Sequence, residues 1–249
     1  MDQEALQKAT KLLEKSKYTT AFTGAGISVE SGIPPFRGPE GLWSRYDPTV
    51  LDINYFHQHP EESWAVIKEI FYDFFGKAKP NVAHFALARL EEKGKLTNII
   101  TQNIDNLHQE AGSHEVYEFH GNSHSLVCTR CGKHFDIRAI SLKALPVLCD
   151  QCGGLIKPDF IFFGEGIPAV AYQKSLEAAR NADVFLVIGT TGEIMPASQI
   201  PFLAKENGAK IIEVNTQPSQ FTHQITDVFL QGKAANVMET LVNNLIRPE

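Results

Sequence analysis

The chain has 249 residues, of which 43% are hydrophobic and 21% are charged, and its formal net charge is −6 at pH 7. A chain of this length can bury a substantial core, either as one large domain or as one domain with an insertion. It contains no run of about 18 apolar residues that could cross a bilayer, and its acidic total argues against a nucleic-acid backbone as the main partner. We therefore expect neither membrane insertion nor direct nucleic-acid binding.

Residues 1–17 predict an amphipathic surface helix. Leu6, Leu12 and Leu13 alternate with lysines and glutamates, which is unlike the apolar centre of a signal peptide. The cysteines suit metal ligation better than disulfides, and this use indicates a reducing compartment. We expect the protein in the cytoplasm.

Apolar runs typical of strands recur along the rest of the chain, with helix-like segments between them. The runs are 18–23, 98–101, 116–119, 160–163, 184–188, 211–214 and 228–230. The helix-like segments are 82–93, 170–181, 197–207 and 234–245. This alternation predicts an α/β fold, a Rossmann-like doubly wound parallel sheet with helices on both faces.

Two stretches interrupt the alternation and predict a smaller lobe formed by two insertions. Residues 34–77 are too long for a simple connection and contain a helical pattern at 61–75, while 122–155 contain all four cysteines. We expect the larger lobe to consist of 1–33, 78–121 and 156–249 and to meet the smaller lobe at a cleft. The whole of 1–249 would then be one catalytic unit.

The four cysteines form two CxxC pairs with the spacing of a zinc site. They are Cys128, Cys131, Cys149 and Cys152, with 17 residues between the pairs. Four thiolates fill a tetrahedral shell and leave no position for a reacting water, so the ion should be structural. A zinc ribbon that binds nucleic acid is an alternative, favoured by nearby Arg130 and Lys133.

Glycines follow the first predicted strand, in the segment from Thr23 to Ser28. Such a turn lets backbone amides approach a phosphate, and a helix beginning there favours its charge. A tight turn without a ligand is equally compatible, because the third glycine of the dinucleotide fingerprint is missing. The segment 31–43, rich in glycine, proline and aromatic residues, is either a ligand-covering loop or an ordinary loop anchored by Phe36 and Trp43.

Polar residues gather where two later strands end. Gln102, Asn103 and Asp105 follow the strand at 98–101, at the edge where doubly wound sheets bind ligands. Asp105 could instead cap a short helix at 106–109. His120 follows the strand at 116–119 and is a candidate general base, although a histidine picked blind from the nine in the chain is more often structural.

In their order along the chain these segments resemble the sirtuin family, NAD-dependent protein-lysine deacylases, of the bacterial or archaeal type. The matching segments are 24–28, 32–34, 36–38, 101–105, 120–121, both cysteine pairs, 163–165, 189–191 and 214–215. The resemblance implies a Rossmann lobe beside a zinc lobe, NAD consumed as a co-substrate, and an acyl-lysine peptide bound in the cleft. We expect a monomer with one structural zinc ion.

The resemblance also implies residue roles. It assigns NAD binding to Gly24, Ala25, Gly26, Ile27, Ser28, Pro34, Phe36, Arg37, Trp43, Gln102, Asn103, Ile104, Asp105, Gly189, Thr190, Thr191, Asn215, Thr216, Gln217 and Ala234. It assigns catalysis to His120 with Gln102, Asn103 and Asp105, and substrate binding to Ile161, Phe163, Gly164, Glu165 and Ile194. The products would be the free lysine, nicotinamide and O-acyl-ADP-ribose.

The sequence departs from the family pattern in three places, Pro35, Thr191 and Glu193. The segment 61–75 has no arginine to bind an acyl carboxylate, so the resemblance favours acetyl groups, with longer neutral acyl groups allowed. Protein mono-ADP-ribosylation remains an alternative with the same co-substrate. An NAD-dependent oxidoreductase is a more distant one, because no tyrosine is followed four residues later by lysine.

Overall fold

The computed structural model describes residues 2–38 and 41–246. Its larger sheet has six parallel strands in the order β3-β2-β1-β7-β8-β9. These strands are β1 (Thr19–Thr23), β2 (Asn98–Thr101), β3 (Val116–Glu118), β7 (Val184–Ile188), β8 (Lys210–Asn215) and β9 (Val228–Gln231). The strand order reverses between β1 and β7, and ligands of such sheets bind at the carboxyl ends of strands at this switch point.

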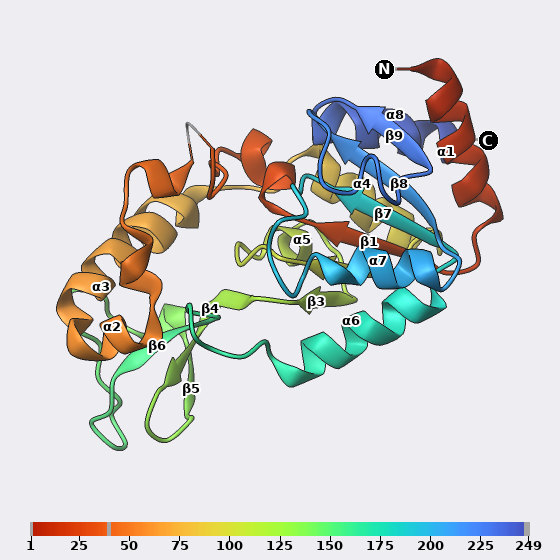
Figure 1. Ribbon diagram of the computed structural model, residues 1–249. Helices are drawn as coiled ribbons and strands as arrows, with labels where there is room; N and C mark the ends of the chain where they lie inside the picture. The colour runs from red at the N-terminus through yellow and green to blue at the C-terminus, as the bar shows by residue number, and fades with distance from the viewer. Residues whose placement is uncertain (1, 39–40, 247–249) are drawn as a thin grey trace.

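Helices cover both faces of the larger sheet (Figure 1). They are α1 (Gln3–Lys15), α4 (Val82–Glu92) and α8 (Ala234–Leu245) on one face, and α6 (Ala169–Asn181) and α7 (Gln199–Glu206) on the other. Side chains of a strand point alternately to the two faces. On β7, Leu186 and Ile188 accordingly lie in the core with α1, α4 and α8, whereas Phe185 and Val187 lie in the core with α6 and α7. The predicted doubly wound sheet is confirmed.

A second core joins the two insertions into a smaller lobe. Its helices are α2 (Ile53–Gln58) and α3 (Pro60–Ile67), and its antiparallel sheet consists of β4 (Gly121–Cys128), β5 (His134–Asp136) and β6 (Ile156–Phe160) in the order β5-β4-β6. Trp64 of α3 is fully buried and donates its indole N–H to the carbonyl of Ile156 on β6 at 2.8 Å. The helical and the sheet insertion thus pack on each other, and Figure 1 shows them at one end of the molecule.

One predicted strand belongs to a different sheet. The apolar run 160–163 was expected in the parallel sheet, but β6 ends at Phe160 and pairs antiparallel with β4. Phe160 and Phe162 pack against Phe56 and Phe71 of the smaller lobe. Residues 156–160, expected in the larger lobe, therefore lie in the smaller sheet. An uninterrupted apolar run shows that a strand is buried but does not show in which sheet.

The helical pattern at 61–75 forms more than one kind of helix. The α3 helix continues into a π-helix at Lys68–Phe74 and a 3₁₀ turn at Phe75–Lys77. The remaining short helices are α5 (Leu107–Glu110) and the 3₁₀ helices Ala25–Ser31, Leu42–Ser44, Pro48–Leu51 and Ile137–Ala139. Within the described residues, no helix combines the length and the apolar character needed to cross a membrane.

Candidate active site

The glycine turn after β1 lies directly against the end of β7. The backbone N–H of Gly26 donates to the carbonyl of Gly189 at 2.8 Å. A Cβ atom on Gly26 would lie 2.6 Å from the Gly189 Cα, and one on Gly24 would lie 2.8 Å from the Gly189 oxygen. Both positions therefore require glycine. The turn leads into the 3₁₀ helix at Ala25–Ser31, where an α-helix would be the usual continuation.

Side chains from three strands join at this switch point. The Gln102 amide, after β2, donates to the hydroxyl of Thr190 at 3.2 Å, and the Asn215 amide at the end of β8 donates to the Thr190 carbonyl at 3.0 Å. Gln102, Thr190 and Asn215 are half-buried, whereas Thr191, Thr216 and Gln217 are exposed at the same edge. Ala234 is buried where α8 begins.

Ser28, Asn103 and Asp105 form one hydrogen-bonded group. The hydroxyl of Ser28 donates to Asp105 Oδ2 at 2.7 Å and accepts from Asn103 Nδ2 at 3.1 Å. Burial raises the pKa of Asp105, and the hydrogen bonds from Ser28 and from the Leu107 amide oppose this rise. The Leu107 bond shows that Asp105 also supports the start of α5, while Asn106 is the N-cap residue, with φ +62°. Ile104 lies half-buried within this segment.

His120 lies just beyond β3 with its ring oriented by the backbone. Its Nδ1 is 3.0 Å from the carbonyl oxygen of Gln102. A carbonyl only accepts, so Nδ1 carries the proton and Nε2 keeps its lone pair. Burial lowers the pKa of His120, partly offset by this hydrogen bond. His120 is therefore neutral at pH 7 and can accept a proton at Nε2.

Two buried histidines behind this group were not singled out in the sequence. His84 Nε2 lies 3.4 Å from the Ser28 hydroxyl, and His108 Nε2 lies 2.9 Å from the Thr23 hydroxyl. Their ring centroids are 5.0 Å apart. Burial lowers the pKa of His84 to about 4 and that of His108 well below its ordinary value, so both are neutral. Only the position of His84 in the first turn of a predicted helix could have indicated a capping role.

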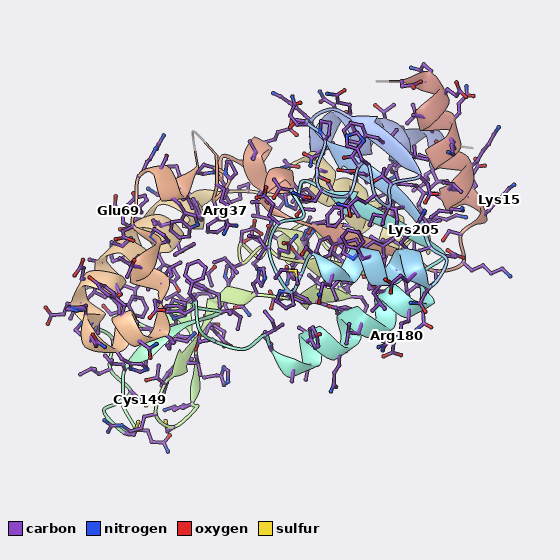
Figure 2. The ribbon with its side chains drawn as sticks, in the orientation of Figure 1. Lys15, Arg37, Glu69, Cys149, Arg180 and Lys205 are labelled. Atoms are coloured by element: carbon purple, nitrogen blue, oxygen red, sulfur yellow. The ribbon has the colours of Figure 1, made fainter. Side chains whose placement is uncertain are left out.

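The segment 31–43, which follows the 3₁₀ helix at Ala25–Ser31, folds back on itself. The amides of Leu42 and Trp43 donate to the carbonyls of Pro35 and Phe36, and the rings of Phe36 and Trp43 lie 5.5 Å apart. Pro34 is half-buried, while Arg37 is exposed (Figure 2). Residues 39 and 40 of this expected loop lie outside the described part of the chain.

The expected peptide-binding segment 161–165 is partly occupied by the chain itself. The N–H of Phe163 donates to Leu51 and its carbonyl accepts from Ile53, so its backbone is fully paired. Its side chain remains 48% exposed. Phe163 can therefore contact a peptide only through its ring. Gly164 is exposed, and the half-buried Ile194 lies in the loop before α7.

The four cysteine sulfurs fit a zinc ion. They lie within 4.8 Å of one another, with 3.5 Å between Cys128 and Cys152 and 3.8 Å between Cys131 and Cys149. Four sulfurs held about 2.3 Å from one ion in a tetrahedron lie about 3.8 Å apart. Each pair forms a tight turn followed by a glycine at positive φ. Figure 2 shows Cys149 at the outer end of the smaller lobe, far from Arg37.

A parallel sheet with a glycine turn at its switch point, joined to a four-cysteine lobe, defines a Rossmann-like protein with a structural metal module. The Sir2 family profile matches residues 24–196. NAD-dependent protein deacylase 2 of Pyrobaculum aerophilum is 44% identical over 240 residues, covering 95% of this chain and 94% of that protein. NAD-dependent protein deacylase of Thermococcus kodakarensis is 43% identical over 248 residues, covering 96% and 95%. The chain belongs to the Sir2 family, the sirtuins.

Solved structures of Sir2 proteins superimpose on this chain over nearly its whole length. A serine-to-alanine variant of a Sir2 homologue in complex with ADP-ribose superimposes with a TM-score of 0.91 at 40% identity, covering 98% of this chain and 96% of that one. A Sir2 histidine-to-alanine variant with a deacetylated p53 peptide and 3′-O-acetyl ADP-ribose gives 0.89 at 37% identity, covering 96% and 97%.

Proposed function

We propose that this protein removes acetyl groups from lysine side chains of proteins, with NAD as co-substrate, and transfers them to ADP-ribose. The observation that carries the proposal is the hydrogen-bonded group of Ser28, Asn103 and Asp105 next to the glycine turn, together with the His120 ring bonded to the neighbouring Gln102 carbonyl, in a member of the Sir2 family. The names of its relatives and the acetyl ADP-ribose complex of one of them support the same reaction.

Each group in the site has a part in this proposal. The amides of the glycine turn and Arg37 hold the pyrophosphate, and Asn103 and Asp105 orient the ribose next to nicotinamide. The acyl oxygen of the substrate attacks the ribose carbon as nicotinamide leaves. His120 then takes a proton from a ribose hydroxyl at Nε2, so that the oxygen can attack the acyl carbon. Phe36 shields the reacting carbon from water.

The test is product analysis with NAD and an acetyl-lysine peptide, comparing wild type with His120→Ala. We expect wild type to release nicotinamide only when the acylated peptide is present, and mass spectrometry to show the free lysine and O-acetyl-ADP-ribose. His120→Ala should lower turnover by about 100-fold or more. Peptide carrying ADP-ribose would establish the transferase alternative instead, and reduced NAD would establish an oxidoreductase.

We expect neutral acyl groups to be preferred. Residues 60–77 hold no arginine, but Arg45 lines a cavity of about 80 Å³ together with Tyr46 and Phe74. Because residues 60–77 offer no guanidinium to pair with an acyl carboxylate, acetyl peptides should be cleaved much faster than succinyl peptides, as measured with matched peptides at saturating NAD. Strong desuccinylation would contradict this prediction. If Arg45→Gln then abolished the desuccinylation, the Arg45 guanidinium would be identified as the group that binds the succinyl carboxylate.

We propose that the protein acts on acylated proteins as a monomer in the cytoplasm. We also propose that it does not bind nucleic acid directly, and the net charge of −6 supports this second point. Light scattering at micromolar concentration tests the monomer, and a dimer would correct it.

A further inference from the structure

A lysine is almost fully buried beside the expected peptide-binding segment. Lys157 on β6 is 5% exposed. Its ammonium group donates to the carbonyls of Pro158 and Phe160 at 2.9 and 2.8 Å, and it contacts Glu165 Oε2 at 3.0 Å. It also lies 4.5 Å from the centre of the Phe162 ring. All three N–H donors of the ammonium therefore have acceptors.

The partner of this lysine shapes the turn from Phe162 to Glu165. Glu165 Oε2 accepts from the N–H of Phe162 at 2.8 Å, and the N–H of Glu165 donates back to the Phe162 carbonyl at 3.0 Å. Gly164 between them has φ +93°. The Oε2 atom of Glu165 is therefore bonded within the protein itself, and the substrate contact that the resemblance implies for Glu165 would be made by its backbone.

The turn leaves a defined set of backbone groups free. No hydrogen bond among the described residues uses the N–H or the carbonyl of Gly164, or the carbonyl of Glu165. The neighbouring amides and carbonyls of Phe162 and Phe163 are paired within the protein. A peptide that adds as a strand needs main-chain groups that are free and held in register. Gly164 and Glu165 supply such groups.

We propose that Lys157 is a positioning residue for the peptide substrate, acting through the Glu165 carboxylate to hold the free backbone groups of Gly164 and Glu165 in place. This inference rests on the proposed function, because it assumes that an acyl-lysine peptide binds at this turn. Removing the ammonium takes one of two donors from the part-buried Glu165 Oε2 and one donor from each of the two carbonyls, which is costly. The turn must then rearrange to reach water.

The experiment measures peptide KM at saturating NAD, NAD KM at saturating peptide, and kcat. The variants are Lys157→Met, which keeps the length without the charge, Lys157→Arg, which keeps the charge, Glu165→Gln, and the Lys157→Met, Glu165→Gln double variant. Lys205→Met is the matched control: Lys205 also pairs with a carboxylate, Asp227 at 2.6 Å, but lies on α7 of the larger lobe (Figure 2).

We expect Lys157→Met to raise peptide KM about tenfold or more, while NAD KM and kcat stay within about twofold. Lys157→Arg should recover part of the loss, and the double variant should be no worse than the worse single variant, because the two side chains act as a pair. Lys205→Met should leave peptide KM unchanged. Should Lys157→Met not fold, Glu165→Gln tests the same turn from Phe162 to Glu165, with peptide KM and NAD KM compared in the same way.

The proposal is overturned if peptide KM stays within about twofold of wild type, or if peptide and NAD KM rise together. The dissociation constant of the acetyl-lysine peptide, measured by calorimetry, separates this outcome from failure of the proposed function. A wild type that binds the peptide without turnover overturns only the deacylation, and the effect of Lys157 is then read from the dissociation constant. A wild type that binds no acyl peptide overturns both.

Discussion

The tautomer of His120 is fixed by a single main-chain carbonyl, that of Gln102, 3.0 Å from Nδ1. Burial lowers the pKa of this ring below its ordinary value, about 6.5 for an exposed histidine. The basic form is the neutral one, so it persists as the pH falls until the lowered pKa is reached. His120 can therefore keep a free acceptor at Nε2 at mildly acidic pH.

This geometry predicts the acidic side of the pH profile. We expect kcat/KM for deacetylation to remain constant down to about pH 6.5 and to fall only as the pH passes below that value, since protonation of His120 removes the acceptor. The measurement is initial rate against pH at constant ionic strength. An acidic limb centred above the ordinary histidine pKa would contradict the assignment of His120 as the base.

The contact between the glycine turn and β7 predicts a second result. Gly26→Ala would place a methyl group 2.6 Å from the Gly189 Cα, an overlap that costs about 2 kcal/mol and lowers the melting temperature by about 4–8 °C. Binding of ADP-ribose, measured by calorimetry, should weaken with it. Gly76→Ala is the control, because the nearest atom to its added Cβ is 3.8 Å away. Equal behaviour of both variants would refute the steric explanation.

Some of these residues were visible in the sequence and others were not. The four cysteines are predictable by spacing alone, because spacing is what a metal ion requires. Gly24 and Gly26 indicate a tight turn by themselves, and their NAD-binding role comes from the family resemblance. His84 and Lys157 were not visible, because each is polar in a segment that otherwise predicts a buried helix or strand. Their partners, Ser28 and Glu165, are 56 and 8 residues away, and only the folded chain brings them together.

Among the elements, the parallel strands were predictable because alternating helices and apolar runs admit few arrangements. The run at 160–163 lies outside the parallel sheet, since Phe160 and Phe162 are buried among side chains of α2, α3 and the π-helix. A buried apolar run looks the same in either sheet. The π-helix at Lys68–Phe74 had no signal that periodicity could detect. The cysteine spacing predicted the metal module but not that its second pair leads directly into β6.

That connection predicts how metal loss acts. Chelation of zinc, or Cys131→Ser, should loosen the small sheet and raise peptide KM, because β6 lies between the second cysteine pair and the turn at Gly164 in the chain. Binding of ADP-ribose should survive, because β1 and β7 lie in the other sheet. Zinc analysis, calorimetry with ADP-ribose and peptide kinetics make the comparison, with zinc added back as the control. Equal loss of both ligands would show that the two sheets do not respond separately.

At the level of the whole molecule, the buried neutral histidines couple folding to pH. His84 has a pKa of about 4 in the folded chain against about 6.5 when unfolded. Between these values the unfolded chain binds a proton that the folded chain does not, so stability falls as the pH drops from about 6.5 to 4. The expected loss from His84 is on the order of 3 kcal/mol.

Thermal unfolding from pH 7.5 to pH 4.5 measures this effect. The melting temperature should be steady above about pH 6.5 and decline below it, and the decline should be shallower in His84→Gln, which cannot titrate. Constant ionic strength separates the effect from screening of surface charges. An identical slope in wild type and variant would show that other groups determine acid stability.

The pairing of Phe163 with residues 51–53 has a mechanical consequence. The glycine turn, the aromatic pair Phe36 and Trp43, and residues 51–53 follow one another in the sequence, and Leu51 and Ile53 are hydrogen-bonded to Phe163. A movement of residues 51–53 would therefore also displace Phe163, which belongs to the segment expected to bind the peptide. In the proposed reaction, the segment that pairs with Phe163 follows the nucleotide-binding turn in the chain, so a movement of that segment on NAD binding would also shift the peptide site.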